Sequence, residues 1–186
     1  MQTYNIYKLL KEELKNGSAD LVTRQSGQVI RERIEMDIAK EEDGEVIALD
    51  FSKIGVIDYS CADEIVAKLV SRLVSGEYGD KYIVLTGLSE NQKENIEVAL
   101  ERKDLSVMAE VDGDKILIGS LHDYLKETLE LILDKGKITG RELSEALNLP
   151  ANTSGTRLLN LYKKRLVKRI AERGEEGRLW VYLACL

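Results

Sequence analysis

The sequence contains no apolar run that approaches the roughly eighteen residues of a membrane-spanning helix. Residues 1–8 lack the charged and then apolar segments of a secretory signal peptide. The only two cysteines, Cys61 and Cys185, lie far apart, and no CxxC pair occurs. We therefore expect two free thiols in a reducing compartment. Together these absences predict a cytoplasmic protein that does not bind a membrane.

Motifs of the common enzyme classes are missing as well. The chain has no GxxxxGK[ST] loop, no GxGxxG, no HExxH and no GxSxG. The single histidine, His122, begins a predicted helix without a partner, and we interpret it as a surface residue. The neighbouring acids Asp63 and Glu64 are expected on different faces of a helix. The sequence thus predicts no enzyme, no catalytic residues, no cofactor and no metal.

Charge is distributed unevenly along a chain whose composition is that of a folded protein. Hydrophobic residues make up 44% of the sequence and charged residues 32%. Residues 1–120 carry 15 Lys and Arg against 24 Asp and Glu, a net charge of −9, whereas residues 121–186 carry 12 against 9, a net charge of +3. The acidic N-terminal part and the basic C-terminal part predict two domains with different partners, over 1–119 and 120–186.

The first domain has the pattern of an α/β fold. Nearly continuous apolar runs at Val46–Asp50 and Tyr82–Thr86 predict buried strands. Apolar residues three and four apart predict helices over 4–14, 26–40 and 60–75, and the capping-box spacing of Ser89 and Gln92 predicts a helix over 89–102. Further strands are predicted over 105–111 and 115–118, and a short one over 20–23. Alternating strands and helices indicate helices packed on a mixed sheet.

The segment 46–66 resembles the STAS fold of anti-sigma-factor antagonists and sulfate transporters. The resemblance is carried by a strand ending in Asp50-Phe-Ser52, a loop Asp58-Tyr-Ser-Cys61 and a following amphipathic helix. A STAS-like family of uncharacterised proteins is closer still, through Ser26-Gly27, Leu49-Asp-Phe51 and Ser60-Cys-Ala-Asp-Glu64. The resemblance spans about residues 20–118 and implies a STAS-like mixed sheet with helices.

This resemblance implies a protein partner and a phosphorylation switch. In the antagonists a kinase of the GHKL ATPase type phosphorylates a serine of that loop, and the added charge breaks a complex. The corresponding position is Tyr59, Ser60 is its neighbour, and Cys61 replaces a glycine. Ser60 followed by Asp63 also has the spacing of a helix N-cap with an acidic third residue. We favour this capping role for Ser60 and keep phosphorylation as the alternative.

The last third of the chain predicts three helices and a hairpin. A helical stripe over 121–135 ends at a glycine, and Thr139 and Glu142 have capping-box spacing before a short second helix. After a turn at 148–150, a third helix is expected from residue 152 or 153. Extended stretches over 168–172 and 178–183 flank a loop with glycine at both ends. The pattern predicts a C-terminal winged helix-turn-helix of α+β type.

This region is similar to winged-helix repressors in the segments 137–147 and 158–170. In such a module the second helix of the helix-turn-helix motif lies in the DNA major groove. We assign Leu158, Leu161 and Leu166 to the inner face of that helix. The predicted DNA-contacting residues are Ser154, Thr156, Arg157, Asn160, Lys163 and Lys164 on the outer face, and Arg173 and Arg178 beside the hairpin tip.

Two features depart from that pattern. Arg165 stands where these repressors usually have glycine after the helix, and Glu175-Glu176 places acid at the hairpin tip. We predict a non-enzymatic transcriptional regulator, a homodimer, with a STAS-like domain that senses a signal or partner. The alternative is a protein-interaction switch partnered by a GHKL-type ATPase, with the winged helix as a docking or dimer element.

Overall fold

A computed structural model describes residues 1–14, 17–174 and 177–186. The chain divides into two compact units, Met1–Ser120 (unit 1) and Leu121–Leu186 (unit 2). The predicted boundary lies one residue earlier. Among the described residues, none of the helices combines the length and the apolar character needed to cross a membrane.

Unit 1 contains a mixed five-stranded sheet in the order β1-β2-β3-β4-β5. Strands β1 to β4 run parallel, and β5 runs antiparallel to β4. The strands are β1 (Gln2–Asn5), β2 (Val46–Asp50), β3 (Tyr82–Thr86), β4 (Ser106–Val111) and β5 (Asp114–Gly119). The prediction of an α/β fold with a mixed sheet is confirmed.

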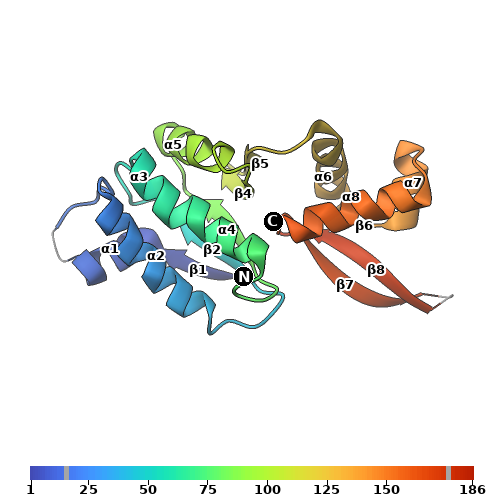
Figure 1. The fold of residues 1–186 in the computed structure, drawn as a ribbon, viewed down its shortest axis with the longest axis horizontal. Helices are drawn as coiled ribbons and strands as arrows, with labels where there is room; N and C mark the ends of the chain where they lie inside the picture. The colour runs from blue at the N-terminus through green and yellow to red at the C-terminus, as the bar shows by residue number, and fades with distance from the viewer. Residues whose placement is uncertain (15–16, 175–176) are drawn as a thin grey trace. The chain divides into compact units, whose positions relative to one another are not determined.

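The helices of unit 1 pack on one face of this sheet. They are α1 (Ile6–Leu14), α2 (Arg24–Ile38), α3 (Tyr59–Ala62), η1 (Asp63–Ala67), α4 (Lys68–Ser75) and α5 (Glu90–Glu101). Because η1 is a single π-helical turn between α3 and α4, these three form one continuous helix, the α3–α4 helix. Figure 1 shows it beside α2, over the strands. Alternate strand residues such as Ile47, Leu49, Ile83 and Leu85 join the helices in one hydrophobic core.

Two local predictions for unit 1 are wrong at the chain's start. Residues 4 and 5 belong to β1 and not to a helix, because Tyr4 pairs with Leu49 of β2 and this ladder satisfies the backbone there. The expected strand over 20–23 is only a single bridge between Leu21 and Ile57. Both errors concern hydrogen bonds to distant segments, which apolar periodicity does not reveal.

The first turns of two helices also differ from expectation. Asp58, not Ser60, caps the α3–α4 helix, because its Oδ1 accepts a hydrogen bond from the Cys61 backbone N–H at 2.8 Å. Similarly, α2 begins after Thr23, whose Oγ1 accepts from the Ser26 N–H at 3.1 Å. In both cases the cap lies two or three residues before the serine that the sequence suggested.

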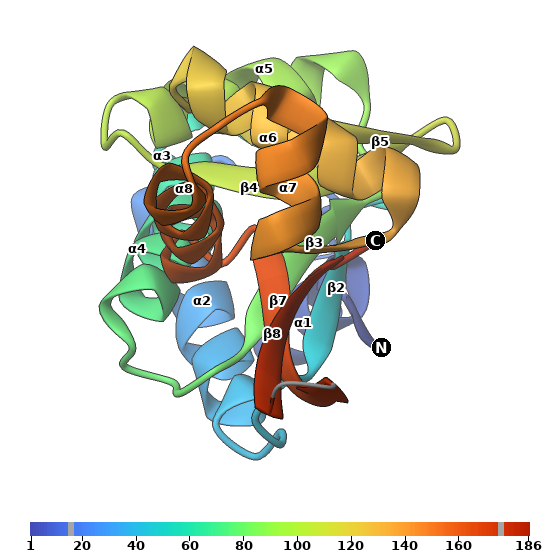
Figure 2. The same cartoon turned by 90° about the vertical axis from the view of Figure 1, so that its right-hand side faces the viewer.

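Unit 2 contains three helices and a three-stranded antiparallel sheet in the order β6-β8-β7. The elements are α6 (Asp123–Lys135), β6 (Lys137–Thr139), α7 (Gly140–Leu147), α8 (Ala151–Lys163), β7 (Val167–Gly174) and β8 (Gly177–Ala184). Figure 2 shows β7 and β8 side by side as a hairpin. The predicted capping box is present, since the Thr139 and Glu142 side chains each bond the other's backbone. Strand β6 was not predicted.

Arg165 occupies a left-handed turn after α8. Its φ is 61°, the conformation in which glycine is usual, and the backbone N–H groups of Arg165 and Leu166 close the helix end on Tyr162 and Leu161. The expected helix end therefore forms with an arginine, at a cost of about 1 kcal/mol. The acidic pair Glu175-Glu176 lies outside the described residues.

Candidate functional site

One stripe of α8 presents polar side chains to solvent. Asn152, Thr156, Asn160 and Lys163 are four, four and three residues apart, so they share a helix face. The Thr156 hydroxyl donates to the Asn152 carbonyl at 2.8 Å. Asn152, Thr156 and Asn160 line a shallow groove of about 470 Å³, and Tyr124 of α6 lines its other side. Of the predicted residues, Thr156, Asn160 and Lys163 thus lie on the accessible side, whereas Asn152 was missed.

Two other predicted residues of α8 are held by contacts within unit 2. Ser154 is fully buried, and its hydroxyl donates to the Pro150 carbonyl at 3.3 Å. Arg157 donates to Glu127 Oε2 at 2.9 Å and to the Tyr124 carbonyl at 3.2 Å, which leaves 15% of its side chain exposed. The placement of Ser154 on the outer face was therefore wrong, whereas Arg157 lines the groove with most of its side chain held against α6. Arg157 fixes α8 on α6 instead, and Lys164 is half-buried after the helix end.

The β7–β8 hairpin carries arginines over aromatic rings on one face. Arg173 and Arg178 lie directly opposite each other, and both are exposed. The Arg178 guanidinium lies 4.3 Å from the centre of the Trp180 ring, and that of Arg169 lies 3.7 Å from it. Tyr182, which pairs with Arg169, continues the same face. We call these five residues the arginine–aromatic face.

Arg169 and Trp180 were not predicted, although the alternation of side chains along a strand gives a signal for them. Arg178, Trp180 and Tyr182 are two residues apart, so a strand places them on one face. A groove of about 450 Å³ runs between this face and the helices α7 and α8, with Arg141 and Leu159 on the helical side. Guanidinium groups that lie over aromatic rings keep their N–H donors and their charge, which suits them to bind phosphate oxygens.

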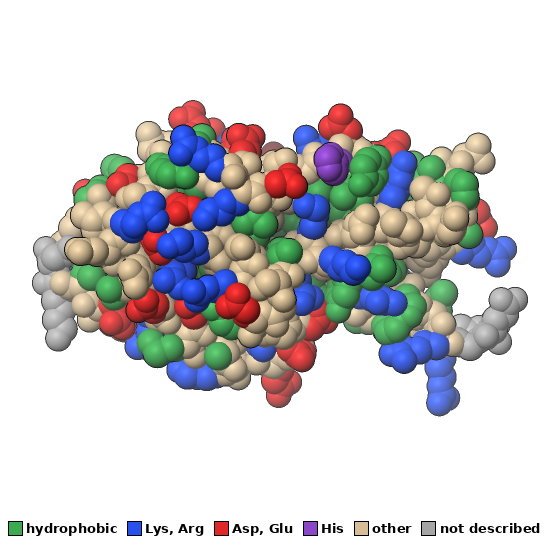
Figure 3. Space-filling model, in the orientation of Figure 1, with side chains coloured by type: hydrophobic (Ala, Val, Ile, Leu, Met, Phe, Trp, Pro, Cys, Tyr) green, Lys and Arg blue, Asp and Glu red, His purple; other side chains and the backbone are tan. Residues whose placement is uncertain are grey.

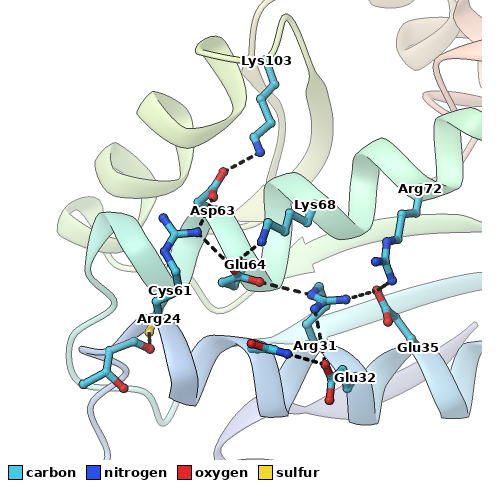
Figure 4. A network of polar contacts seen from close by, with 12 residues as sticks. Arg24, Arg31, Glu32, Glu35, Cys61, Asp63, Glu64, Lys68, Arg72 and Lys103 are labelled. Atoms are coloured by element: carbon cyan, nitrogen blue, oxygen red, sulfur yellow. Dashed lines mark hydrogen bonds and ion pairs between the residues drawn. The ribbon is translucent and has the colours of Figure 1, made fainter.

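Unit 1 buries two adjacent carboxylates in the π-helical turn. Asp63 and Glu64 are 5% and 2% exposed. Arg24 from the first turn of α2 reaches both, with its Nη1 3.2 Å from Asp63 Oδ2 and 2.8 Å from Glu64 Oε1 (Figure 4). The two acids face different neighbours, Lys103 for Asp63 and Arg31 for Glu64, and the long Arg24 side chain joins them.

Further cations complete a network around these acids. Lys103 Nζ lies 2.8 Å from Asp63 Oδ1, and Lys68 pairs with Glu64. Arg31, itself buried, places its Nε 3.4 Å from Glu64 Oε2 and donates through Nη1 to Glu35 at 2.8 Å. On the far side Arg72 donates to Glu35 at 2.7 Å.

The pKa values of the two buried acids report this network. Burial raises the pKa of Asp63, but Lys103 and Arg24 outweigh it, so the net pKa is below its usual range. Burial likewise raises the pKa of Glu64, and Lys68 and Arg24 outweigh it there. Both side chains are therefore held as carboxylates, charged partners for the cations around them.

Gly27 and Cys61 explain how α2 approaches the π-helical turn. A Cβ at Gly27 would lie 3.0 Å from the Cys61 Cα and from the Glu64 Cβ, so a side chain here would press α2 and the π-helical turn apart. The Cys61 thiol donates to the Thr23 carbonyl at 2.9 Å. Burial raises the pKa of Cys61 to about 12, which makes a nucleophilic thiolate unfavourable. The Ser26-Gly27 motif thus has a packing role.

Ser60 and Tyr59 lie at the start of the α3–α4 helix. The Ser60 hydroxyl is half-buried and donates to both carboxylate oxygens of Asp58, at 2.9 and 3.0 Å. A phosphoryl group on Ser60 would stand beside that carboxylate, which opposes it electrostatically. The Tyr59 ring lies 4.5 Å below the Arg102 guanidinium. The local geometry favours a structural role for Ser60.

No model of a known protein family matches the chain, and no curated protein matches it. Within the part of the chain that the structure describes, no group of three or more His, Cys, Asp and Glu side chains is arranged to hold a metal ion.

Proposed function

We propose that the protein is a non-enzymatic transcriptional regulator that binds double-stranded DNA through unit 2. The arginine–aromatic face carries this proposal, together with the polar stripe of α8. Unit 2 acts as a winged helix-turn-helix domain, and unit 1 acts as a STAS-like module that senses a signal or a protein partner.

The arrangement of unit 2 supports the winged-helix assignment. Helices α7 and α8 are joined by the short turn at 148–150, as in a helix-turn-helix, and a long hairpin follows. Strand β6 joins that hairpin to form a three-stranded sheet. In this arrangement α8 is the helix that enters the major groove, and the hairpin is the wing.

Different residues contact the DNA bases and the DNA backbone in this proposal. Asn152 and Asn160 on the α8 stripe supply amide groups of the type that pair with adenine edges, and Lys163 meets a phosphate. Arg173 and Arg178 bind the backbone or the minor groove next to it. Arg157 is a positioning residue, because its bonds to α6 set the orientation of α8.

Unit 1 supports the STAS-like assignment through its mixed sheet and its β2–loop–helix segment. Strand β2 ends at Asp50, and the helix that follows is capped by Asp58. The net charge of −9 on unit 1 repels DNA, whereas the net charge of +3 on unit 2 attracts it. The charge division thus directs DNA to unit 2.

Fluorescence anisotropy with a labelled duplex of mixed sequence tests DNA binding directly. We expect binding that weakens steeply between about 50 and 200 mM salt. The double variant Arg173→Gln/Arg178→Gln should bind roughly tenfold more weakly and lose up to about two units of salt slope, since each phosphate contact releases about one counterion.

The matched control is Lys126→Gln/Lys135→Gln, which removes the same charge from exposed positions of α6. It should change the affinity by less than about twofold. The proposal fails if the protein shows no salt-dependent binding below tens of micromolar, or if both double variants weaken binding equally.

The regulator is proposed to act as a homodimer, because paired recognition helices read two half-sites about 34 Å apart. Sedimentation equilibrium of the full chain checks this. If the protein is a monomer at the concentrations that saturate DNA, the proposed dimer is contradicted, but the proposed DNA contact of unit 2 is not.

A protein-interaction switch partnered by a GHKL-type ATPase is the second candidate. The cations gathered around the α3–α4 helix favour a protein contact on unit 1. Incubation with such an ATPase and ATP, followed by mass spectrometry, tests the phosphorylated form. A gain of about 80 Da at Ser60 or Tyr59 supports it, and an unchanged mass removes it.

A further inference from the structure

The groove of about 450 Å³ in unit 2 lies between the arginine–aromatic face and the helices α7 and α8. Leu159 of α8 lines one side, and Trp180 of β8 lines the other. Gly155 also lines the groove, and a Cβ added there would meet no atom within 4 Å, so the space beside α8 is open. In Figure 3 the hairpin, at the lower right, shows Lys and Arg side chains beside hydrophobic ones. A groove of this volume is large enough for a small-molecule ligand.

The charged residues that line this groove are all arginines. They are Arg141, Arg169 and Arg178, and no Asp or Glu of the described residues lines it. Arg141 is neutralised, because its Nε lies 3.0 Å from Glu145 Oε1. Within the described part of the chain, no carboxylate forms an ion pair with Arg169 or Arg178, which contact aromatic rings instead. The groove therefore keeps two positive charges that these residues do not neutralise.

Arg169 is held by three rings. Its guanidinium lies 3.7 Å from the centre of the Trp180 ring, 5.7 Å from that of Tyr162 and 5.8 Å from that of Tyr182. Its Nε is buried and has no hydrogen-bond partner among the described residues. Buried polar groups nearly always have such a partner, so Arg169 is a cation that its own unit leaves unsatisfied. A guanidinium already fixed in place loses little conformational entropy when it binds an anion.

The number of unpaired charges indicates the class of anion. Arg178 lies 4.3 Å from the centre of the same Trp180 ring and lines the same groove, so both guanidinium groups can contact one ligand. A phosphate monoester carries about −1.5 to −2 charges at pH 7 and offers three acceptor oxygens, which matches two guanidinium groups. A carboxylate or a phosphodiester carries a single negative charge and would leave one of the two cations unpaired.

We propose that this groove binds a small phosphate monoester of about the size of a mononucleotide. Arg169 and Arg178 bind the phosphate, and the rest of the ligand lies against Leu159 in the space beside Gly155. The site itself does not depend on DNA binding. Its regulatory consequence rests on the proposed function: because Arg178 also contacts DNA there, the bound ligand weakens DNA binding by unit 2.

Adenosine 5′-monophosphate is the probe, and Trp180, the only tryptophan of the chain, is the reporter. Titration of the full-length protein should change the Trp180 emission with a Kd below about 1 mM. Adenosine has no phosphate and should not bind. Adenosine 3′,5′-cyclic monophosphate has a single negative charge and should bind at least about tenfold more weakly. Isothermal titration calorimetry measures the same affinities independently of the ring.

Two variants and a control test the residues of the groove. Arg169→Gln removes a ring-held charge and should weaken nucleotide binding at least about tenfold. Gly155→Leu fills the space beside α8 and should weaken it to a similar extent without a change in charge. Lys168→Gln removes one charge from the next residue of β7, whose side chain lies on the opposite face of the strand, and should change the affinity by less than about twofold. Thermal unfolding verifies that each variant is folded.

The proposal is overturned if the nucleotide does not bind at about 1 mM, if the cyclic monophosphate binds equally well, or if Arg169→Gln and Lys168→Gln weaken binding equally. A DNA duplex without terminal phosphates separates this site from a backbone contact, since Arg169→Gln should change its affinity by less than about threefold. Equal losses of duplex and nucleotide binding in Arg169→Gln would assign the groove to DNA and overturn the small ligand. Duplex binding without nucleotide binding overturns this proposal alone and leaves the proposed function intact.

Discussion

The two units hold their arginines in different ways. In unit 1 Arg24, Arg31 and Arg72 are bound by carboxylates, whereas in unit 2 Arg169 and Arg178 rest on the Trp180 ring. A carboxylate cancels the charge of the arginine that it positions, and a ring does not. The carboxylates of unit 1 therefore neutralise the guanidinium groups that they position, whereas the guanidinium groups over Trp180 in unit 2 keep their charge.

The largest expected effect comes from removing a carboxylate-bound arginine from the interior. Arg31→Met should destabilise unit 1 by about 3 kcal/mol, because Glu64 and Glu35 lose a buried partner. Arg33→Met on the same helix removes a surface pair with Asp37 and should have a much smaller effect. Urea unfolding of the full chain measures both. Similar losses would show that Arg31 is not specifically needed.

Acid should weaken the same network. The pKa values of Asp63 and Glu64 are lowered in the folded protein, so their contribution is complete above the unfolded values near 4 and is lost as the pH falls below them. The urea midpoint of unit 1 should therefore fall between about pH 5 and pH 3. Arg31→Met should reduce this pH dependence, and an unchanged profile would contradict the role of the network.

Replacement of a helical glycine by alanine should change stability in opposite directions in the two units. Gly27→Ala should destabilise unit 1 by about 1–3 kcal/mol, because its Cβ would press on Cys61 and Glu64. Gly155→Ala lies in α8 with no atom within 4 Å of the added Cβ, and it should stabilise unit 2 by about 0.5–1 kcal/mol. Thermal unfolding of each variant, monitored by circular dichroism, measures the two changes in stability. A neutral Gly27→Ala would mean that α2 moves away without cost.

The smallest expected effect concerns the ring-held arginines. Trp180→Leu keeps an apolar side chain but removes the ring beneath Arg169 and Arg178. DNA binding should weaken about two- to fivefold, in line with about 0.5–1 kcal/mol for an exposed cation–π contact. Anisotropy with the duplex used above measures it. Full affinity in Trp180→Leu would show that the ring does not prepare these arginines for DNA.

Local signals in the sequence were sufficient for much of the fold. The capping boxes at Ser89 and Thr139 and the apolar runs of β2 and β3 depend on neighbouring residues, and the structure confirms them. The buried network was not predictable in this way, because Arg24, Glu64 and Lys103 are far apart in the chain. For Arg157 the residue type suggested a DNA contact, but the direction of its side chain depends on the position of α6.

The π-helical turn changes the mutational pattern expected of its helix. An ordinary surface helix alternates tolerant and intolerant positions every three to four residues. Here seven consecutive residues, 61–67, are all buried. A systematic substitution scan of this helix should therefore return an unbroken block of intolerance over 61–67, and the periodic pattern should resume only from Lys68 onward.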